Sequence, residues 1–312
     1  MKRVVSISLG SSKRDKKVHA SFFGEDFEIS RVGVDGDLKA YRRKIEELDG
    51  TVDAFGVGGT DIYFYAGSRR YTSRETLQLW SAAKKTPYVD GSGLKHTLER
   101  ETVAYLQDNG IVDFTRKAVL IVCAVDRFGM AEALAARAKS IVFGDMIFNL
   151  GINKPIRSLA TMQRLARLML PVIMQLPIAW FYPMGEKQEQ VTPKYPEYFA
   201  EADVIAGDFL LIRRYMPDNL VGKIIFTNTT TEEDVAALQK RGVHQLITTT
   251  PVFDGRSFGT NVMEAVLVAL LGKQPQEISP EDYLAKLREL GWKPRVQELN
   301  QAVERPLVGA AV

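Results

Sequence analysis

Residues 117–145, KAVLIVCAVDRFGMAEALAARAKSIVFGD, have the pattern of a strand, a helix and a second strand. An apolar run at 118–124 is followed by a helical segment near 129–138 and by another short apolar run at 140–144. Two strands joined by a crossover helix lie parallel in one sheet. The stretch therefore predicts the beginning of a parallel α/β sheet.

The same alternation of strand and helix continues along the chain to residue 272. The expected strands are 118–124, 140–144, 178–182, 203–207, 222–227 and 244–249. The expected helices lie near 129–138, 157–174, 231–241 and 260–271. Strands connected in this way predict a doubly wound, Rossmann-like and mainly parallel sheet over residues 117–272.

The first 112 residues have an α/β alternation of their own. RVVSISL and VDAFGVGG read as strands, and DLKAYRRKIEELDG reads as a helix with Asp37 as its N-cap. DIYFYAGSRRYT fits an antiparallel hairpin. Residues 273–312 form a helical tail that packs across one domain or makes an oligomer contact, as in a homodimer. The fold class is α/β, with two α/β domains at 1–112 and 117–272 and C-terminal helices.

Composition excludes several classes of function. The 41 basic and 38 acidic side chains give a net charge of +3, which favours neither nucleic acid nor a membrane surface as partner. The apolar run LMLPVIMQLPIAWFY contains prolines and is too short for a bilayer, and the N-terminus lacks a secretory signal pattern. A single cysteine, Cys123, and three histidines provide no zinc-type cluster. We expect a cytoplasmic protein that binds a small molecule and no metal.

Polar residues are concentrated where the expected strands end. In open parallel sheets, ligands bind outside the carboxyl ends of the strands. This rule selects Asp126, Arg127, Asp145, Asp208, Thr227, Asn228, Thr229 and, in the last loop, Arg256. These residues are the candidates for binding a cofactor.

The loop AVDRFG departs from a dinucleotide-binding turn, because two of the three usual glycines are absent. Gly129 could still pack the helix on the strand, Arg127 could pair with a phosphate, and Asp145 could accept hydrogen bonds from ribose hydroxyls. An acidic residue at that position favours NAD over NADP. In the alternative interpretation, Asp126 is only an N-cap and Asp145 only a turn residue.

Candidates in the N-terminal domain follow its own strand ends. Ser8, Ser11 and Ser12 could hold a carboxylate or sugar hydroxyls, and Asp61 follows the glycines of GVGGTD. Lys95, or the adjacent His96, could transfer a proton if burial lowers the lysine pKa. The alternative is a solvated lysine in the first turn of a helix. Further along, the segment from Arg256 to Thr260 could form an anion cradle where a helix begins.

The segments RVVSISLGSSKRD, DAFGVGGTDIY, VDGSGLKHTLER, AVDRFGMAEAL and TNTTTEEDV resemble the shikimate/quinate dehydrogenase family, in particular bacterial proteins labelled quinate 5-dehydrogenase. The resemblance implies NAD(P)-dependent oxidation of a hydroxylated cyclic carboxylic acid. It also implies that serines of SLGSS hold the substrate and that Lys95 is the acid/base. The family's glycine turn is replaced here, and the aspartate that normally accompanies its lysine has no counterpart.

Two alternatives remain open beside the oxidoreductase. Asp126, Asp145 and Asp208 at neighbouring strand ends could bind Mg²⁺ in a non-redox enzyme acting on a phosphorylated or nucleotide-like substrate. The chain could also be a non-catalytic ligand-binding protein with the same two-domain cleft.

Overall fold

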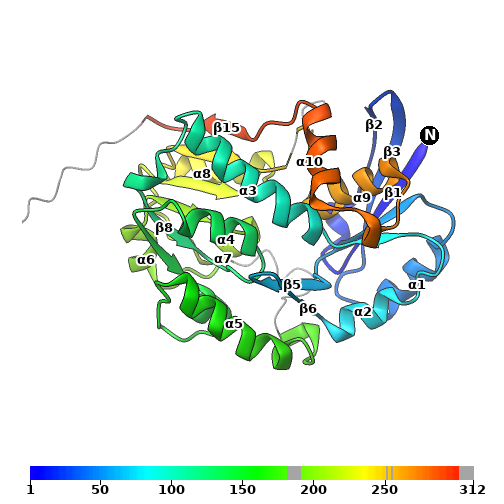
Figure 1. Ribbon diagram of the computed structural model, residues 1–312, viewed down its shortest axis with the longest axis horizontal. Helices are drawn as coiled ribbons and strands as arrows, with labels where there is room; N and C mark the ends of the chain where they lie inside the picture. Colours follow the sequence, from blue (N-terminus) through cyan, green and yellow to red (C-terminus); the bar gives the residue numbers. More distant parts are fainter. Residues whose placement is uncertain (181–190, 251, 254–255, 302–312) are drawn as a thin grey trace, which may run out of the picture.

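The computed structural model describes residues 1–180, 191–250, 252–253 and 256–301, without the side chains of 180 and 252–257. In this part of the chain, two sheets lie side by side with helices packed around them (Figure 1). No helix within the described residues has the length and apolar character needed to cross a membrane.

The N-terminal sheet has the strand order β2-β3-β1-β4-β7. Its strands are β1 (Lys2–Ser8), β2 (Lys16–Phe22), β3 (Glu25–Gly33), β4 (Ala54–Gly58) and β7 (Tyr88–Val89). β1 pairs in parallel with β3 and β4, β4 pairs in parallel with β7, and only β2 runs antiparallel, on the edge. Helices α1 (Leu38–Leu48) and α2 (Arg74–Trp80) accompany this sheet, and Asp37 caps α1 by accepting from the N–H groups of Lys39 and Ala40. The N-cap predicted at Asp37 is therefore confirmed.

The second sheet has the order β15-β12-β11-β10-β8-β9. Its strands are β8 (Ala118–Ile121), β9 (Ser140–Phe143), β10 (Val204–Ala206), β11 (Ile224–Thr227), β12 (Gln245–Thr248) and β15 (Arg295–Glu298). All neighbouring pairs are parallel except β12 and β15. The predicted α/β class with two mainly parallel sheets is confirmed.

One expected strand of this sheet is wrong. Residues Ile178–Trp180 form a short 3-10 helix, and residues 181–182 lie outside the described residues. The sixth strand is instead β15, which comes from the C-terminal tail and covers the edge of β12. An isolated apolar segment does not reveal whether it pairs with a distant strand, because the pairing partner lies far away in the sequence.

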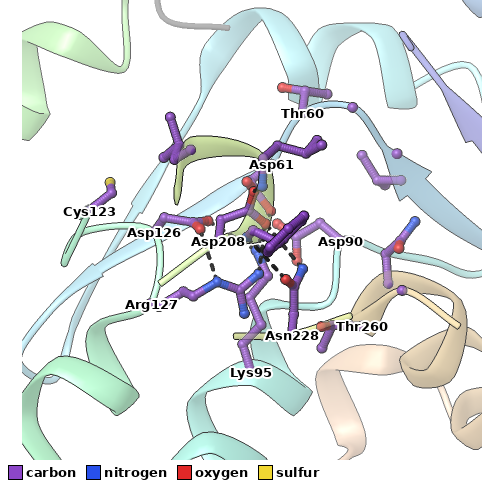
Figure 2. Close-up of a pocket in the computed structure, with 18 of the residues that line it drawn as sticks. Thr60, Asp61, Asp90, Lys95, Cys123, Asp126, Arg127, Asp208, Asn228 and Thr260 are labelled. Carbon is purple, nitrogen blue, oxygen red and sulfur yellow. Dashed lines mark hydrogen bonds and ion pairs between the residues drawn. The ribbon is translucent and has the colours of Figure 1, made fainter. Parts of the chain in front are cut away.

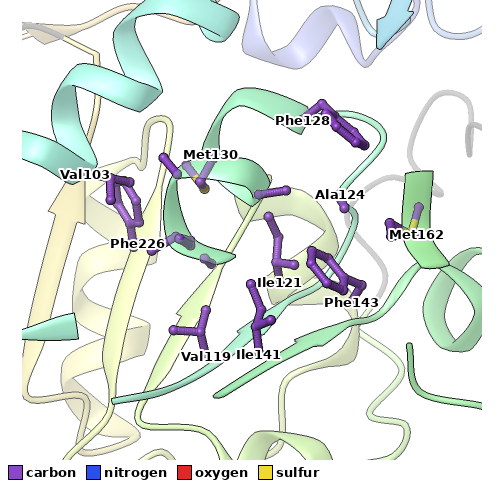
Figure 3. Close-up of a cluster of buried hydrophobic side chains, with 14 of the residues drawn as sticks. Val103, Val119, Ile121, Ala124, Phe128, Met130, Ile141, Phe143, Met162 and Phe226 are labelled. Atoms are coloured by element: carbon purple, nitrogen blue, oxygen red, sulfur yellow. The ribbon is translucent and has the colours of Figure 1, made fainter. Parts of the chain in front are cut away.

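The helices fill both faces of the second sheet. They are α4 (Phe128–Ala135), α5 (Leu159–Ile173), α6 (Pro196–Glu201), α7 (Phe209–Tyr215) and α8 (Glu232–Lys240). Apolar side chains of β8 and β9 alternate between two buried clusters, so that Ile121 and Phe143 pack with α4 (Figure 3) while Leu120 and Val142 face the opposite side. The sheet is therefore buried on both faces, as expected of a doubly wound fold.

The chain passes between the two sheets several times. Helix α3 (Ser92–Asp108) connects β7 to the second sheet, and α9 (Thr260–Leu271) returns to pack on β1 and β4. Helix α10 (Pro280–Glu289) packs on α3 before β15 rejoins the second sheet. Thus α9, from the range 117–272, lies on the N-terminal sheet, and β15, from the tail, extends the second sheet.

The hairpin predicted in DIYFYAGSRRYT is confirmed. β5 (Tyr63–Ala66) and β6 (Arg69–Thr72) pair antiparallel, and β5 contacts α4 and α5. Phe64 and Tyr71 belong to the buried cluster of the second sheet, although the hairpin directly follows β4 of the first. The hairpin therefore connects the two domains, because it follows a strand of the first sheet and packs in the core of the second.

Candidate functional site

A cleft with a volume of about 750 Å³ lies between the carboxyl ends of the two sheets. Ser8 ends β1 on one side of the cleft. Asp61 follows β4 on the same side, while Asp126, Asp208 and Asn228 follow β8, β10 and β11 on the other (Figure 2). A volume in the range of roughly 300–1,000 Å³ is typical of sites for small organic molecules. Both sheets thus direct their strand ends at one ligand-sized space.

Lys95 lies on the floor of this cleft with its charge neutralised. Its Nζ atom is 2.7 Å from Asp61 Oδ1 and 3.1 Å from Asp126 Oδ1, and the residue is 9% exposed. Burial acts to lower the pKa of Lys95, but the attraction of Asp126 and Asp61 outweighs burial and raises the pKa above its ordinary value. The condition for the predicted proton-transfer role, a net lowering of this pKa, is therefore not met, and Lys95 holds its proton at neutral pH.

The two carboxylates beside Lys95 differ in their protonation. Burial raises the pKa of Asp61 to about 7, against the opposing attraction of Lys95. Burial also opposes ionisation of Asp126, but Lys95 and Arg127 together outweigh it and lower the pKa of Asp126. The Lys95 cation therefore contacts both carboxylates, and its charge favours the ionised form of Asp126.

Arg127 is buried in a second ion-pair cluster beside the first. The residue is 2% exposed and its guanidinium pairs with Glu99 of α3, with Asp208 Oδ2 at 3.1 Å, and with Asp126 Oδ2 at 3.4 Å. Each guanidinium nitrogen thus faces a carboxylate of the protein. The predicted pairing of Arg127 with a phosphate therefore gains no support.

Asp145 also serves the protein and not a cofactor. Its carboxylate accepts hydrogen bonds from the backbone N–H groups of Ala124 and Val125, at 3.0 Å each. Burial raises its pKa to about 6. In a dinucleotide site the turn after the first strand must offer its amides to the pyrophosphate, and here two of these amides are already used.

Gly129 allows close packing of two helices. A Cβ atom at this position would lie 2.7 Å from the backbone oxygen of His96 and 3.1 Å from its Cα atom. The glycine therefore lets α4 approach α3. The expected packing of helix on strand is wrong, since the close neighbour is another helix.

Replacing Gly129 with alanine is expected to destabilise the protein by about 1–3 kcal/mol, because a backbone neighbour cannot rotate away from the added methyl group. Urea denaturation would measure the change. Ala136→Ser, an exposed change at the end of the same helix, should remain within about 0.5 kcal/mol of the wild type. Equal stability of G129A and the wild type would contradict the packing role.

The structure brings together only part of the predicted site. The candidates that line the cleft are Ser8, Asp61, Lys95, Asp126, Arg127, Asp145, Asp208, Asn228 and Thr229. The other candidates with described side chains, Ser11, Ser12, His96 and Thr227, are not among its lining residues. The Arg256 side chain lies outside the described residues.

Local contacts explain what these other candidates do. Ser11 Oγ accepts from the N–H of Lys13, and Thr227 Oγ1 donates to the backbone oxygen of Gly207 at 2.8 Å. His96 stacks on Tyr65 with ring centroids 4.9 Å apart, and burial lowers its pKa. These contacts are structural, so the predicted binding and acid/base roles of these residues gain no support.

Sequence reasoning missed two parts of the cleft. Arg31 enters from β3, where the sequence provided no candidate site residue. One face of α5 forms an apolar wall through Met162, Leu165, Ala166, Met169, Leu170 and Ile173. The sequence did predict a helix near 157–174, but a helix that faces a cleft has the same apolar pattern as one that faces a core.

The three acids proposed to bind Mg²⁺ do not converge. Asp126 faces Lys95, Asp208 faces Arg127, and Asp145 accepts from backbone amides. Within the described residues, no group of three or more His, Cys, Asp and Glu side chains could hold a metal ion. The magnesium alternative therefore lacks its ligand set.

Comparison with known families gives two matches. Residues 93–299 match a domain of unknown function, DUF8754, and residues 3–90 match a second, DUF8753. The first match covers more than half of the chain, so the protein belongs to the DUF8754 family. No curated protein matches the sequence significantly.

Solved structures include distant similarities to solute-binding proteins. One is an ABC transporter periplasmic solute-binding protein from Actinobacillus succinogenes with bound D-allose, 9% identical over 96% of this chain and 98% of that one, with a TM-score of 0.38. Another, from Agrobacterium vitis with bound α-D-tagatopyranose, is 10% identical over 89% and 92%, also with a TM-score of 0.38. A galactofuranose-binding protein is 10% identical over 93% and 99%, with a TM-score of 0.34. TM-scores this low do not establish a shared fold.

The expected membership of the shikimate/quinate dehydrogenase family is wrong, because the chain belongs to the DUF8754 family. The expected NAD(P)-dependent oxidoreductase and its NAD cofactor are wrong as well. Asp145 occupies the amides of the first turn, Arg127 is enclosed by carboxylates, and Lys95 holds its proton. The loop AVDRFG thus lacks the glycine turn of a dinucleotide site. Side chains of the protein itself bind the groups that a dinucleotide would need.

Proposed function

We propose that the protein is a non-catalytic binding protein that holds a small hydroxylated organic molecule between its two domains. One observation carries this proposal: the carboxyl ends of both sheets border a single cleft of about 750 Å³ whose buried charges are already paired within the protein. Such a cleft offers shape and hydrogen bonds, and its buried lysine and arginine are both held by carboxylates of the protein.

The lining groups suit hydroxyls and amides. Asn228 and Thr229 can both donate and accept, and Asp208, 23% exposed at its side chain, can accept from a ligand hydroxyl. The α5 wall provides apolar contact on the opposite side. Small-molecule sites commonly combine a few fixed polar groups with a larger apolar lining.

Binding can be tested by thermal unfolding with glucose, sorbitol, gluconate, glucose 6-phosphate and NAD. A ligand at about 100 times its Kd stabilises the folded state by about 2.7 kcal/mol, which raises the Tm by several degrees. We expect a shift with at least one hydroxylated compound and none with NAD. Nuclear magnetic resonance of the bound compound should show that it is released unchanged.

Thr230→Phe provides the matched variant, because Thr230 lines the cleft and the larger ring would fill part of it. The control is Thr161→Phe, an exposed position on α5 that does not line the cleft. T230F should abolish the shift and T161F should retain it. Absence of a shift with every hydroxylated compound, or chemical conversion of a bound one, would contradict the proposal.

A further inference from the structure

Resting on the proposed binding function, we propose that the N-terminal end of helix α9 holds an oxyanion, a carboxylate or a phosphate, carried by the ligand in the cleft. The site consists of Gly259, Thr260 and Asn261 at the beginning of this 12-residue helix, all three of which line the cleft. The ligand would then be a hydroxylated acid or a hydroxylated phosphate ester and not a neutral compound.

The first turn of α9 supplies backbone donors, of which the N–H groups of Val262 and Met263 donate to the backbone oxygen of Gly259. Gly259 is the N-cap, and because it has no side chain it makes no capping hydrogen bond. The first N–H groups of a helix have no partner within the helix, and its dipole favours negative charge at this end. A carboxylate or phosphate oxygen is the usual group to satisfy such donors.

The Thr260 hydroxyl is the second and independent observation. Thr260 is 4% exposed, and its Oγ1 atom has no hydrogen-bond partner among the described residues. Figure 2 shows this side chain at the cleft with its oxygen toward the group of labelled polar side chains. A buried hydroxyl without a partner is unfavourable, and a ligand oxygen would supply the missing partner.

Positive side chains line the same end of the cleft. They are Arg14, Lys16 and Arg31. Lys16 Nζ lies 5.8 Å from the ring centroid of Phe258, the residue before Gly259, and Asn261 Nδ2 donates to Ser6 Oγ at 3.0 Å. Ser6 is the register partner of Arg31 between β1 and β3, which places this arginine beside the first turn of α9.

Three contacts hold Arg31 at this end of the cleft. Its guanidinium donates to Ser8 Oγ at 3.0 Å, to the backbone oxygen of Ser11 at 2.9 Å and to Asp15 Oδ1 at 2.8 Å. Burial, followed by repulsion from Arg14, lowers the pKa of Arg31, so a bound anion would stabilise its charged form.

The opposite end of the cleft would repel an anion. Asp126, Asp208, Glu232 and Asp234 line it, with Lys95, Arg127 and Arg214 as the cations. An oxyanion at the α9 end would direct the hydroxyls of the same molecule toward Asp208 and Asn228. Charge thus fixes the orientation of the ligand between the domains.

Titration calorimetry with two matched pairs tests this site. Gluconate and sorbitol differ in one carboxylate, and glucose 6-phosphate and glucose differ in one phosphate, so the two arms separate the two oxyanions. We expect at least one anionic member to bind about tenfold or more tightly than its neutral partner, because hydrogen bonds to a charged group contribute more binding free energy than those to a neutral group. The preference should weaken at high salt because the cations are partly exposed.

Thr260→Val removes the hydroxyl at nearly constant volume, and Thr115→Val is the exposed control. T260V should lose about tenfold of the affinity for the anionic member, leave the neutral member within about twofold, and raise the Tm of the unliganded protein. Equal affinity for both members of each pair, or unchanged anion affinity in T260V, would overturn the anion site alone. Failure of all four compounds to bind the wild-type protein would overturn the binding function with it.

Discussion

Arg127→Met should destabilise the protein by about 3–5 kcal/mol, the usual effect of removing one member of a buried ion pair. The guanidinium is almost fully enclosed and contacts Glu99, Asp126 and Asp208, which come from α3 and from two strand ends. Without it, Glu99 remains 1% exposed and loses its ion pair with Arg127, with Lys95 as a more distant cation. One of its oxygens, Oε2, already has no hydrogen-bond partner among the described residues. Chemical denaturation at pH 7 would measure the loss.

The loss should be smaller at low pH. Burial raises the pKa of Glu99 against the attraction of Arg127, and removing the arginine raises this pKa further. Glu99 in R127M would therefore be protonated in the folded state. Taking up this proton costs free energy at neutral pH, and this cost disappears at a pH at which Glu99 is also protonated in the unfolded chain. R127M should thus approach wild-type stability as the pH falls toward 4.

Two further variants distinguish the effect of this buried network on stability from that of an exposed ion pair. Arg213→Met removes the partner of Asp234 from a pair that is 37% exposed on the arginine side, and it should cost no more than about 1 kcal/mol. E99Q/R127M removes both charges and should be more stable than R127M. If R127M and R213M lose the same stability, the buried pairs contribute no more than a surface contact.

The position of the candidate site could be predicted from the sequence because it depends on local pattern and one general rule. Apolar runs located the ends of β8, β10 and β11 to within a few residues, and parallel strands bring their carboxyl ends together. Asp126, Asp208 and Asn228 consequently line the cleft, as the rule implies. No information about distant parts of the chain was needed for this step.

The partners of these residues could not be predicted in the same way. Glu99 is 28 positions before Arg127, and Asp208 is 81 positions after it. Whether an arginine at a strand end faces a ligand or a buried carboxylate depends on the packing of α3 against α4, which no local pattern records. The dehydrogenase interpretation assigned Arg127 and Asp145 to a cofactor because their protein partners were not visible.

The return of α9 to the N-terminal sheet is a second long-range feature. Its sequence is apolar around most of its circumference, which predicts a buried helix but not the sheet that buries it. In the structure α9 packs on β1 and β4 and makes contact with α3. This packing brings Thr260 to the cleft and places Glu264, one turn further along, among buried residues of α9, α10 and α3.

The wild-type protein is expected to lose stability as the pH rises from about 4.5 to 8, and Glu264→Gln is expected to abolish this loss. Burial, followed by the charge of Asp90, raises the pKa of Glu264 to about 8. Its Oε1 atom accepts from the Tyr283 hydroxyl at 2.8 Å, and the residue is 4% exposed. Glutamine keeps this acceptor and cannot ionise.

The sign follows from the protons bound in each state. Between these pH values the unfolded chain has released the Glu264 proton while the folded protein still holds it, so rising pH favours unfolding. The raised pKa corresponds to about 3–5 kcal/mol over the full window, since each pKa unit equals about 1.4 kcal/mol. Above pH 8 both states are ionised and the contribution is constant.

Urea denaturation at several pH values between 4.5 and 8.5 would measure the two profiles. Asp61 and Asp145, whose pKa values burial raises to about 7 and about 6, act in the same direction in the wild type and in E264Q, so the difference between the profiles isolates Glu264. Glu281→Gln, an exposed position in the first turn of α10, should leave the wild-type profile unchanged. Parallel profiles for the wild type and E264Q would show that Glu264 is ionised in the folded protein, and the packing of α9 against α10 would then have to accommodate a buried charge.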